Sequence, residues 1–449
     1  YHEGLFYVLF VALETHTTYL YTTKDMNKPW KRRTIEGFYH DASLLFDGER
    51  VFITYGNGDI HLTELKKDLS GPLPGGFDEV IISDNHNPIL GYEGSHIYHI
   101  GDYYYVFLIH SLRDEWMRVE ACFRSKHVEG PYEGKDILND TRDYCSQGVA
   151  QGGIVEDAKG NWWGILFQDH GAVGRIPVLV PIHWEEGWPV LGENGRVPDQ
   201  FRVPGEDGDL HSEADTKKSV PDVNSLYQSD DFGAPSNVSE ATLRKNYGSY
   251  GFRSCWQFNH EPTLPLVGRR NHTLFITTGK ICQTVTDAQN TLTQRALFPA
   301  CAAEVTLDAS RLKVGDTAGL CALQGCYGFV GLRRTKDGLF IVMEHKKASE
   351  DPSKPQDPHA PGITEACIPF DGKKLRLAVS LNFDRMRDEA TFIYEENGAW
   401  KQIGPKHKLY FKLDHFTGCR FGLFAYATET IGGTAGFSKF VYLDQELSI

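Results

Sequence analysis

The sequence predicts an all-β protein whose first 200 residues repeat one short pattern. In each repeat, a glycine turn is followed by a run of aromatic and β-branched residues, which are typical of strands. The turn glycines are Gly4, Gly48, Gly101 and Gly160. The chain is also rich in glycine (45 residues) and in aromatic residues (12%), and long helical periodicity is absent from the sequence. This composition is that of an all-β fold.

The spacing of the repeats favours a β-propeller. The turn glycines are about 44, 53 and 59 residues apart, within the range expected of propeller blades. Each repeat continues with further strands; in the second, we expect strands at 51–55 and 60–65. A propeller closes its ring to remove sheet edges. Because the chain starts inside the first repeat, we expect the N-terminal part of the propeller to be missing, with its inner strand upstream of Tyr1.

The periodicity changes near residue 200. From about 198 to 231 the chain becomes polar and charged, which predicts a linker or wrapping segment at 201–229. Alternating strands then recur and indicate a second β domain, a two-sheet sandwich. These strands are expected at 274–278, 302–307, 328–332, 339–344 and 375–381. We therefore predict a propeller at 1–200 and a β-sandwich at 230–449.

Net charge and hydropathy argue against two classes of partner. A formal charge of −14 would repel nucleic acid and anionic membrane surfaces, whereas neutral, hydroxyl-rich substrates suffer no such penalty. The longest apolar runs, such as 176–182, are far shorter than the roughly 20 residues of a membrane span. No signal peptide is visible, but the N-terminus does not appear to be natural, so this absence says little about the compartment. We expect a secreted or periplasmic protein rather than a cytoplasmic one. The sequence does not distinguish a monomer from an oligomer.

The nine cysteines lack the spacing of a metal site. Their number is odd and there is no Cys-x-x-Cys pair, which argues against zinc. Cys321 and Cys326 could pair with each other or remain reduced in the core. We favour reduced thiols, because cysteine is commonly a small buried hydrophobe.

Two carboxylates precede two of the repeats at equivalent positions. Asp41 lies ahead of the second repeat, in the segment 40–46, and Glu93 lies ahead of the third, in the segment 92–98. The inner strands of a propeller converge on its axis, so acids at equivalent starts of adjacent blades can lie within several ångströms. The alternative is that Asp41 caps a turn and Glu93 is a solvated turn acid. Their equivalent positions favour a site.

The blocks that carry these acids resemble glycoside hydrolase family 43, and so do two blocks of the fourth repeat. The four blocks are Tyr39-His-Asp-Ala-Ser-Leu44, Tyr92-Glu-Gly-Ser-His96, Gly174-Arg-Ile-Pro-Val-Leu-Val-Pro-Ile-His-Trp184 and Gly187-Trp-Pro-Val190. Four later blocks resemble the concanavalin-like sandwich of the xylosidase-type members. They are Trp256-Gln-Phe-Asn-His260, Asn290-Thr-Leu-Thr-Gln-Arg295, Ala318-Gly-Leu-Cys-Ala-Leu-Gln324 and Tyr327-Gly-Phe-Val-Gly331. The resemblance implies a five-bladed propeller followed by a jelly-roll, concanavalin-like β-sandwich.

The resemblance also implies a role for each acid. Glu93 matches the general acid of an inverting hydrolase, and Asp41 matches the carboxylate that orients and tunes it. The general base, an aspartate of the first blade, would lie upstream of Tyr1 and is not in this chain. Inverting hydrolysis needs a protonated carboxyl at the leaving oxygen and an ionised one that activates water on the opposite face. Glu93 must therefore keep its proton near neutral pH, which repulsion by Asp41 and partial burial would favour.

Other residues are expected to bind the sugar. Arg175 occupies the place of an arginine that hydrogen-bonds the bound sugar, with a blade-to-blade salt bridge as the alternative. His170 lines the same pocket or makes a structural hydrogen bond. Gln151 stands where many members have a histidine linked to a central calcium or water cluster. We therefore expect no required metal or cofactor, although a structural calcium in the propeller channel stays an alternative. His96 is interpreted as a structural hydrogen-bonder behind Glu93.

Aromatic residues near these motifs are candidates for stacking against sugar rings. They are Tyr39, Trp116, Phe167 and Trp30, each with the propeller core as its alternative. In the second domain, the segments 256–260 and 324–329 could supply a loop that narrows the pocket, with sandwich core as the alternative.

The resemblance implies an exo-acting inverting glycosidase that releases xylose, arabinofuranose or both from xylan-type oligosaccharides. The missing base supports a second hypothesis, a non-catalytic carbohydrate-binding protein of the same fold. A third, a propeller that serves only as an interaction module, fits less well because such modules do not need paired acids on inner strands.

Overall fold

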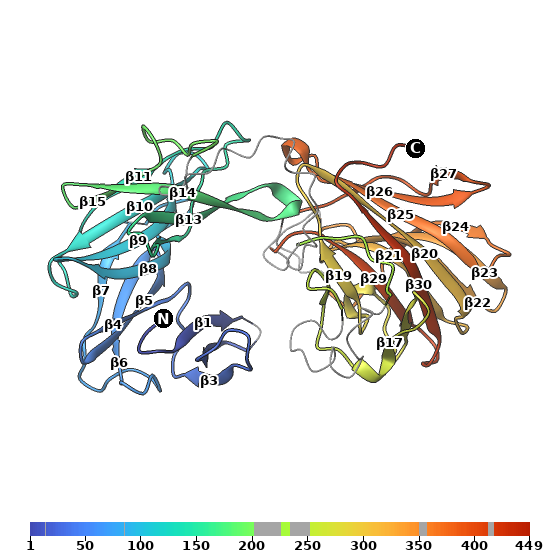
Figure 1. The fold of residues 1–449 in the computed structure, drawn as a ribbon, viewed down its shortest axis with the longest axis horizontal. Coiled ribbons are helices and arrows are strands. Elements are labelled where there is room, and N and C mark those ends of the chain that lie inside the picture. Colours follow the sequence, from blue (N-terminus) through green and yellow to red (C-terminus); the bar gives the residue numbers. More distant parts are fainter. Residues whose placement is uncertain (14, 85, 202–225, 234–251, 350–356, 412–416) are drawn as a thin grey trace. The chain divides into compact units, whose positions relative to one another are not determined.

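The computed structural model describes the chain except residues 14, 85, 202–225, 234–251, 350–356 and 412–416 (Figure 1). Most of the predicted linker at 201–229 therefore lies outside the described residues. The contacts divide the chain into two units. The first comprises Tyr1–Asp169 and Ile176–Leu210, and the second comprises His170–Arg175 and His211–Ile449. No helix in the described ranges is long and apolar enough to cross a membrane.

The first unit is a β-propeller made of four consecutive antiparallel sheets, as the repeats predicted (Figure 1). The first sheet contains β1 (Phe6–Ala12), β2 (Thr17–Thr23) and β3 (Lys31–Ile35). The second contains β4 (Ser43–Asp47), β5 (Arg50–Asn57), β6 (Asp59–Leu65) and β7 (Asp78–Ser83). The third contains β8 (Glu93–Ile100), β9 (Tyr103–Ser111), β10 (Arg118–Ser125) and β11 (Glu133–Leu138). The fourth contains β12 (Gly153–Glu156), β13 (Trp162–Asp169), β14 (Arg175–Glu185) and β15 (Trp188–Leu191).

The predicted turn glycines lie where the backbone requires them. Gly4, Gly48, Gly101 and Gly160 have φ angles of 78°, 58°, 60° and 85°, in the region that side chains with a Cβ rarely adopt. Gly48 and Gly101 each open the tight hairpin between the first two strands of a blade. The repeated glycine therefore fixes the hairpin register of successive blades.

Each pair of neighbouring blades buries an apolar cluster between its sheets. The first interface includes Leu20, Ile35, Val51 and Ile53; the second, Phe52, Leu62, Ile97 and Leu108; the third, Phe107, Val149, Leu166 and Val180. The two end sheets are apolar on their other faces as well. Val8 and Phe10 of β1 are 46% and 45% exposed, and Val155, Ile165 and Leu179 of the fourth sheet are 45%, 54% and 45% exposed.

The second unit is the predicted β-sandwich, with one sheet of seven strands and one of eight. The seven-stranded sheet contains β16 (Gln257–Phe258), β19 (Leu292–Arg295), β29 (Arg420–Ala427), β21 (Asp316–Leu323), β22 (Gly328–Thr335), β23 (Gly338–His345) and β24 (Ile363–Pro369). The eight-stranded sheet contains β17 (Val267–Arg269), β18 (Leu274–Thr277), β30 (Thr434–Leu443), β20 (Ala300–Arg311), β25 (Lys374–Asn382), β26 (Glu389–Glu396) and β27 (Ala399–Gln402) in a row, and β28 (His407–Lys408) pairs with β26. Alternate residues of both sheets form one large core cluster.

All nine cysteines lie in described parts of the chain and carry free thiols, seven of them buried. The structure therefore favours the reduced alternative over a Cys321–Cys326 disulfide.

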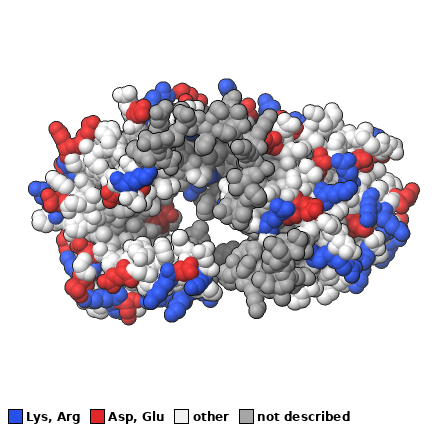
Figure 2. Space-filling view, viewed as in Figure 1, with Lys and Arg blue, Asp and Glu red and all other residues white. Residues whose placement is uncertain are grey.

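Charged side chains of both signs lie on both units in the view of Figure 2.

The buried His407 makes the sandwich sensitive to acid. Its Nε2 lies 2.8 Å from the Cys326 carbonyl oxygen and therefore donates to it, and burial lowers the pKa of His407 to about 4. The unfolded chain binds this proton near the ordinary histidine pKa of ~6.5. Stability from neutral His407 is therefore present above about pH 6.5 and is lost as the pH falls toward about 4.

We expect the free energy of unfolding of the sandwich to lose ~2 kcal/mol between pH 7 and pH 5 through this one group. The substitution His407→Gln keeps an amide donor but removes the titration, so the loss should shrink by that amount in urea titrations at the two pH values. His272→Gln, at an exposed histidine, is the control. An equal pH dependence in wild type and His407→Gln would contradict the assignment.

Candidate active site

The loop before β4 and the start of β8 bring the two predicted acids together. Asp41 lies two residues before β4 and has a φ of 47°, a left-handed conformation that aspartate tolerates better than most residues. Its carbonyl oxygen accepts a hydrogen bond from the Ser95 N–H at 3.1 Å, which ties this loop to the next blade. Glu93 is the first residue of β8, and the register of β8 against β9 shifts between Glu93 and His96. Such an irregularity re-aims a side chain.

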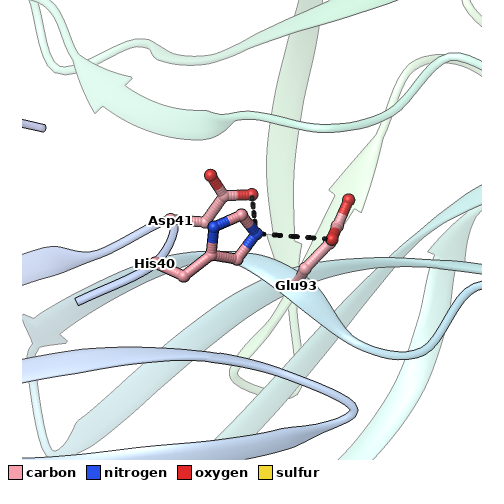
Figure 3. A group of neighbouring side chains, drawn as sticks. All are labelled: His40, Asp41 and Glu93. Carbon is pink, nitrogen blue, oxygen red and sulfur yellow. Dashed lines mark ion pairs between the residues drawn. The ribbon is translucent and has the colours of Figure 1, made fainter. Parts of the chain in front are cut away.

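A histidine lies between the two carboxylates. His40 Nε2 is 3.8 Å from Asp41 Oδ2 and 3.7 Å from Glu93 Oε2 (Figure 3). Two amide groups complete the cluster: Asn57 Nδ2, at the end of β5, donates to Glu93 Oε2 at 2.7 Å, and Gln151 Nε2, two residues before β12, donates to Asp41 Oδ2 at 3.2 Å. The side chain of Glu93 is 18% exposed, that of Asp41 33% and that of His40 39%. The cluster is thus half-buried and open to solvent on one side.

The carboxylates favour a cationic His40. Its pKa is raised chiefly by the neighbouring carboxylate of Glu93, against the opposing effect of burial, and the negative charge of Asp41 adds to the rise. On β8, burial lowers the pKa of His96, and the charge of Asp41 only partly offsets this. The two histidines therefore differ: a neutral ring is favoured at the partly buried His96, and a cationic ring is favoured at His40.

One nitrogen or oxygen from each of His40, Asp41 and Glu93 lies within 4.8 Å of the others, a spacing that would admit a cation. No other set of three such side chains in the described ranges is this compact. However, the carboxylates favour a cationic His40, and one oxygen of each carboxylate accepts a hydrogen bond from an amide. We therefore interpret the cluster as a hydrogen-bonded acid centre.

The predicted sugar-binding residue Gln151 joins this cluster through Asp41. The packing is close: Gly94 has a φ of 70°, and a Cβ there would lie 2.2 Å from the Gln151 amide nitrogen. Phe167 is adjacent, because its carbonyl oxygen accepts from the N–H of Ala150. Its ring and that of Trp116 both lie over the guanidinium of Arg118, at 5.6 and 5.4 Å from the ring centres.

Other predicted residues lie elsewhere. Tyr39 is only 3% exposed, with its ring against Tyr55 and its hydroxyl donating to the Glu36 carbonyl, so it belongs to the core, the alternative left open for it. His170 and Arg175 group with the second unit, where the His170 ring packs against Phe298. Their contact with a bound sugar remains a prediction.

The two segments proposed to narrow the pocket contain buried side chains. Trp256 is 2% exposed and donates its indole N–H to Asp230, and Gln324 is 2% exposed and donates to the Ala172 and Tyr410 carbonyls. For these two residues the structure shows sandwich core, the alternative.

Sequence reasoning missed His40 and Asn57. His40 directly precedes Asp41, and this adjacency was its only signal. Asn57 is the last residue of β5 and lies 36 residues before Glu93 in the sequence. The two side chains meet only because adjacent blades pack together, so nothing in the sequence signals this contact.

The comparisons with known proteins agree with this architecture. Residues 1–189 match the model described as Glycosyl hydrolases family 43. Residues 244–443 match the one described as Beta xylosidase C-terminal Concanavalin A-like domain.

Individual relatives extend the match. A non-reducing end α-L-arabinofuranosidase from Bacteroides ovatus is 28% identical over 222 residues, which are 45% of this chain and 41% of that protein. A β-xylosidase from Formosa agariphila is 23% identical over 503 aligned positions, which cover 98% of this chain and 76% of that protein. A solved structure titled bifunctional GH43-CE from Bacteroides eggerthii has a TM-score of 0.82 and 35% identity, covering 100% of this chain and 54% of that one. The chain thus spans about half the length of this solved relative.

Both domain matches occur in the order that the fold shows, and the paired acids lie within the first. The chain therefore belongs to glycosyl hydrolase family 43 and carries the concanavalin A-like domain described for β-xylosidases.

Proposed function

We propose that the protein is an exo-acting inverting glycoside hydrolase that releases xylose, arabinofuranose or both from xylan-type oligosaccharides. The observation that carries this proposal is the meeting of Asp41 and Glu93 at the starts of adjacent blades, with His40 between them. The names of the relatives, a β-xylosidase and an α-L-arabinofuranosidase, support this substrate class. They give no support to the non-catalytic alternative.

Within this mechanism Glu93 is the general acid and Asp41 orients it. Asp41 is not suited to be the base, because its oxygen lies within 4.8 Å of Glu93, whereas the two carboxyl groups of an inverting pair are ~6.5–9.5 Å apart. A retaining pair is ~5–5.5 Å apart, but it must leave room for the sugar between its members. His40 Nε2 occupies that space. A third carboxylate is therefore needed as the base.

We propose that a fifth blade supplies this base. The outer faces of the two end sheets expose apolar residues, among them Phe10 on β1 and Ile165 on β13, which are 45% and 54% exposed. A blade with two apolar faces would cover both and close the ring, as propellers do to remove sheet edges. The reaction needs only carboxyl groups and water, so we propose no required cofactor. Gln151, Phe167, Trp116, Arg175 and His170 are the candidate sugar contacts.

The test uses the natural full-length protein with xylobiose and with chromogenic β-D-xylopyranoside and α-L-arabinofuranoside. We expect turnover of at least one, and proton NMR of the first product should show inversion at the anomeric carbon. Retention would instead require a carboxylate nucleophile and would overturn the inverting mechanism. Sugar binding without turnover would favour the non-catalytic alternative.

A further inference from the structure

His40 is held by the backbone in a place where one ring nitrogen reaches both acids. Its carbonyl oxygen accepts from the Gly56 N–H at 3.1 Å, and that of Asp41 accepts from Ser95. The two peptide units are thus anchored to β5 of their own blade and to β8 of the next. Nε2 lies almost equally far from the two carboxylates, and Figure 3 shows the ring edge directed into the gap between them.

The arrangement leaves the two oxygens of Glu93 in different environments. Oε2 accepts from Asn57 at 2.7 Å and faces His40 at 3.7 Å. The other oxygen points away from His40 (Figure 3). A general acid that gives its proton from this second oxygen develops negative charge on the carboxylate, and donors already placed at Oε2 stabilise that charge.

We infer that His40 is a positioning residue for the hydrolysis: its Nε2, 3.7 Å from Oε2 of Glu93, forms an ion pair with the carboxylate that develops as the proton passes to the leaving oxygen, and so stabilises it. This inference rests on the proposed function. Asp41 then acts indirectly, because its carboxylate keeps the imidazole protonated and oriented. The three side chains form a line, Asp41 to His40 to Glu93, that strengthens the acid without touching the sugar.

The charged groups around His40 account for its protonation. Asp41, from the same loop, favours the cation, and Glu93 of β8 does so in its ionised state. Asn57 from β5 is neutral and contacts Glu93 rather than the ring. His96 of β8, which also interacts with the charge of Asp41, has a lowered pKa and favours the neutral state. The cation is thus opposed by burial alone.

The first experiment is independent of turnover. Imidazole NMR titration of the wild type, with the His40 signal assigned by its loss in His40→Gln, should give a midpoint above the ordinary histidine value. Glu93→Gln should lower that midpoint, and Asp41→Asn should lower it by less. A midpoint that stays unchanged in Glu93→Gln would overturn the inference.

The second experiment separates positioning from a general structural role. A leaving group that needs protonation depends on the acid, whereas a dinitrophenolate does not. His40→Ala should reduce kcat on xylobiose by ~10²-fold, at the lower end of what general acid catalysis contributes, and on dinitrophenyl xyloside by less than ~3-fold. His40→Gln, which keeps a donor without the charge, should recover part of the loss.

The matched control is His183→Gln, at an exposed histidine whose Nε2 lies 2.9 Å from Glu185. It should leave both substrates unaffected. Equal losses on both leaving groups in His40→Ala, with an active wild type, would overturn the role of His40 and leave the proposed function intact. A wild type that turns over neither substrate would overturn the proposed function, and this inference with it.

Discussion

Replacing Glu93 by glutamine is expected to abolish most hydrolysis of xylobiose, with kcat lowered ~10³–10⁴-fold, in the upper part of the range that general acid catalysis supplies. Glutamine has the shape of glutamate and can still accept a hydrogen bond from Asn57. It has no acidic proton for the leaving oxygen. KM should change little, because the interaction that is lost is made only in the transition state.

The choice of substrate makes this experiment specific. Glu93→Gln should retain far more activity on dinitrophenyl xyloside than on xylobiose, since the dinitrophenolate leaves without a proton. Glu79→Gln is the matched control, an exposed glutamate on β7 of the neighbouring blade, and should behave as wild type. Unchanged hydrolysis of xylobiose by Glu93→Gln would show that the acid is another residue.

The features that sequence predicted well are those set by local chemistry. A glycine at positive φ and the β-branched run after it depend only on neighbouring residues, so the four blades could be located from turns such as Gly48 and Gly101. Equivalent positions in repeats also have equivalent places in space. For this reason Asp41 and Glu93 could be paired without knowledge of the fold.

The remaining parts of the site depend on contacts between distant segments. Gln151 meets Asp41 across 110 residues, and Asn57 meets Glu93 across 36. Neither amide can be recognised from its neighbours in the sequence, because an amide beside a strand can equally well face solvent. Tyr39 illustrates the same limit. An aromatic ring beside a catalytic motif can pack in the core or stack against a sugar, and the sequence does not distinguish the two. The contact between the Tyr39 and Tyr55 rings, seen only in the structure, places Tyr39 in the core.

Breaking the buried ion pair between Arg118 and Asp169 by removing one partner is expected to destabilise the propeller strongly. Arg118 lies on β10 and Asp169 ends β13, and their side chains, 9% and 7% exposed, form a direct hydrogen bond between adjacent blades. The guanidinium also lies over the rings of Trp116 and Phe167. Removing one partner leaves the other charge buried and uncompensated, which costs ~3–5 kcal/mol in proteins.

We therefore expect Asp169→Ala to lower the free energy of unfolding of the first unit by ~3–5 kcal/mol. The chain has two units, so a single unfolding midpoint would mix them. Hydrogen exchange of β10 and β13 amides in increasing denaturant measures the first unit alone, and amides of β21 in the second unit provide the internal reference. Protection should fall in the former and stay constant in the latter.

Two further variants separate the loss of attraction from the burial of an unpaired charge. The double variant Arg118→Met with Asp169→Leu removes both charges and fills the space with apolar groups, so it should be much more stable than Asp169→Ala. Glu389→Gln, which breaks the exposed pair with Lys406, should cost only ~0.5 kcal/mol. If Asp169→Ala and the double variant were equally unstable, lost packing or lost attraction would explain the cost, and the argument from an uncompensated buried charge would fail.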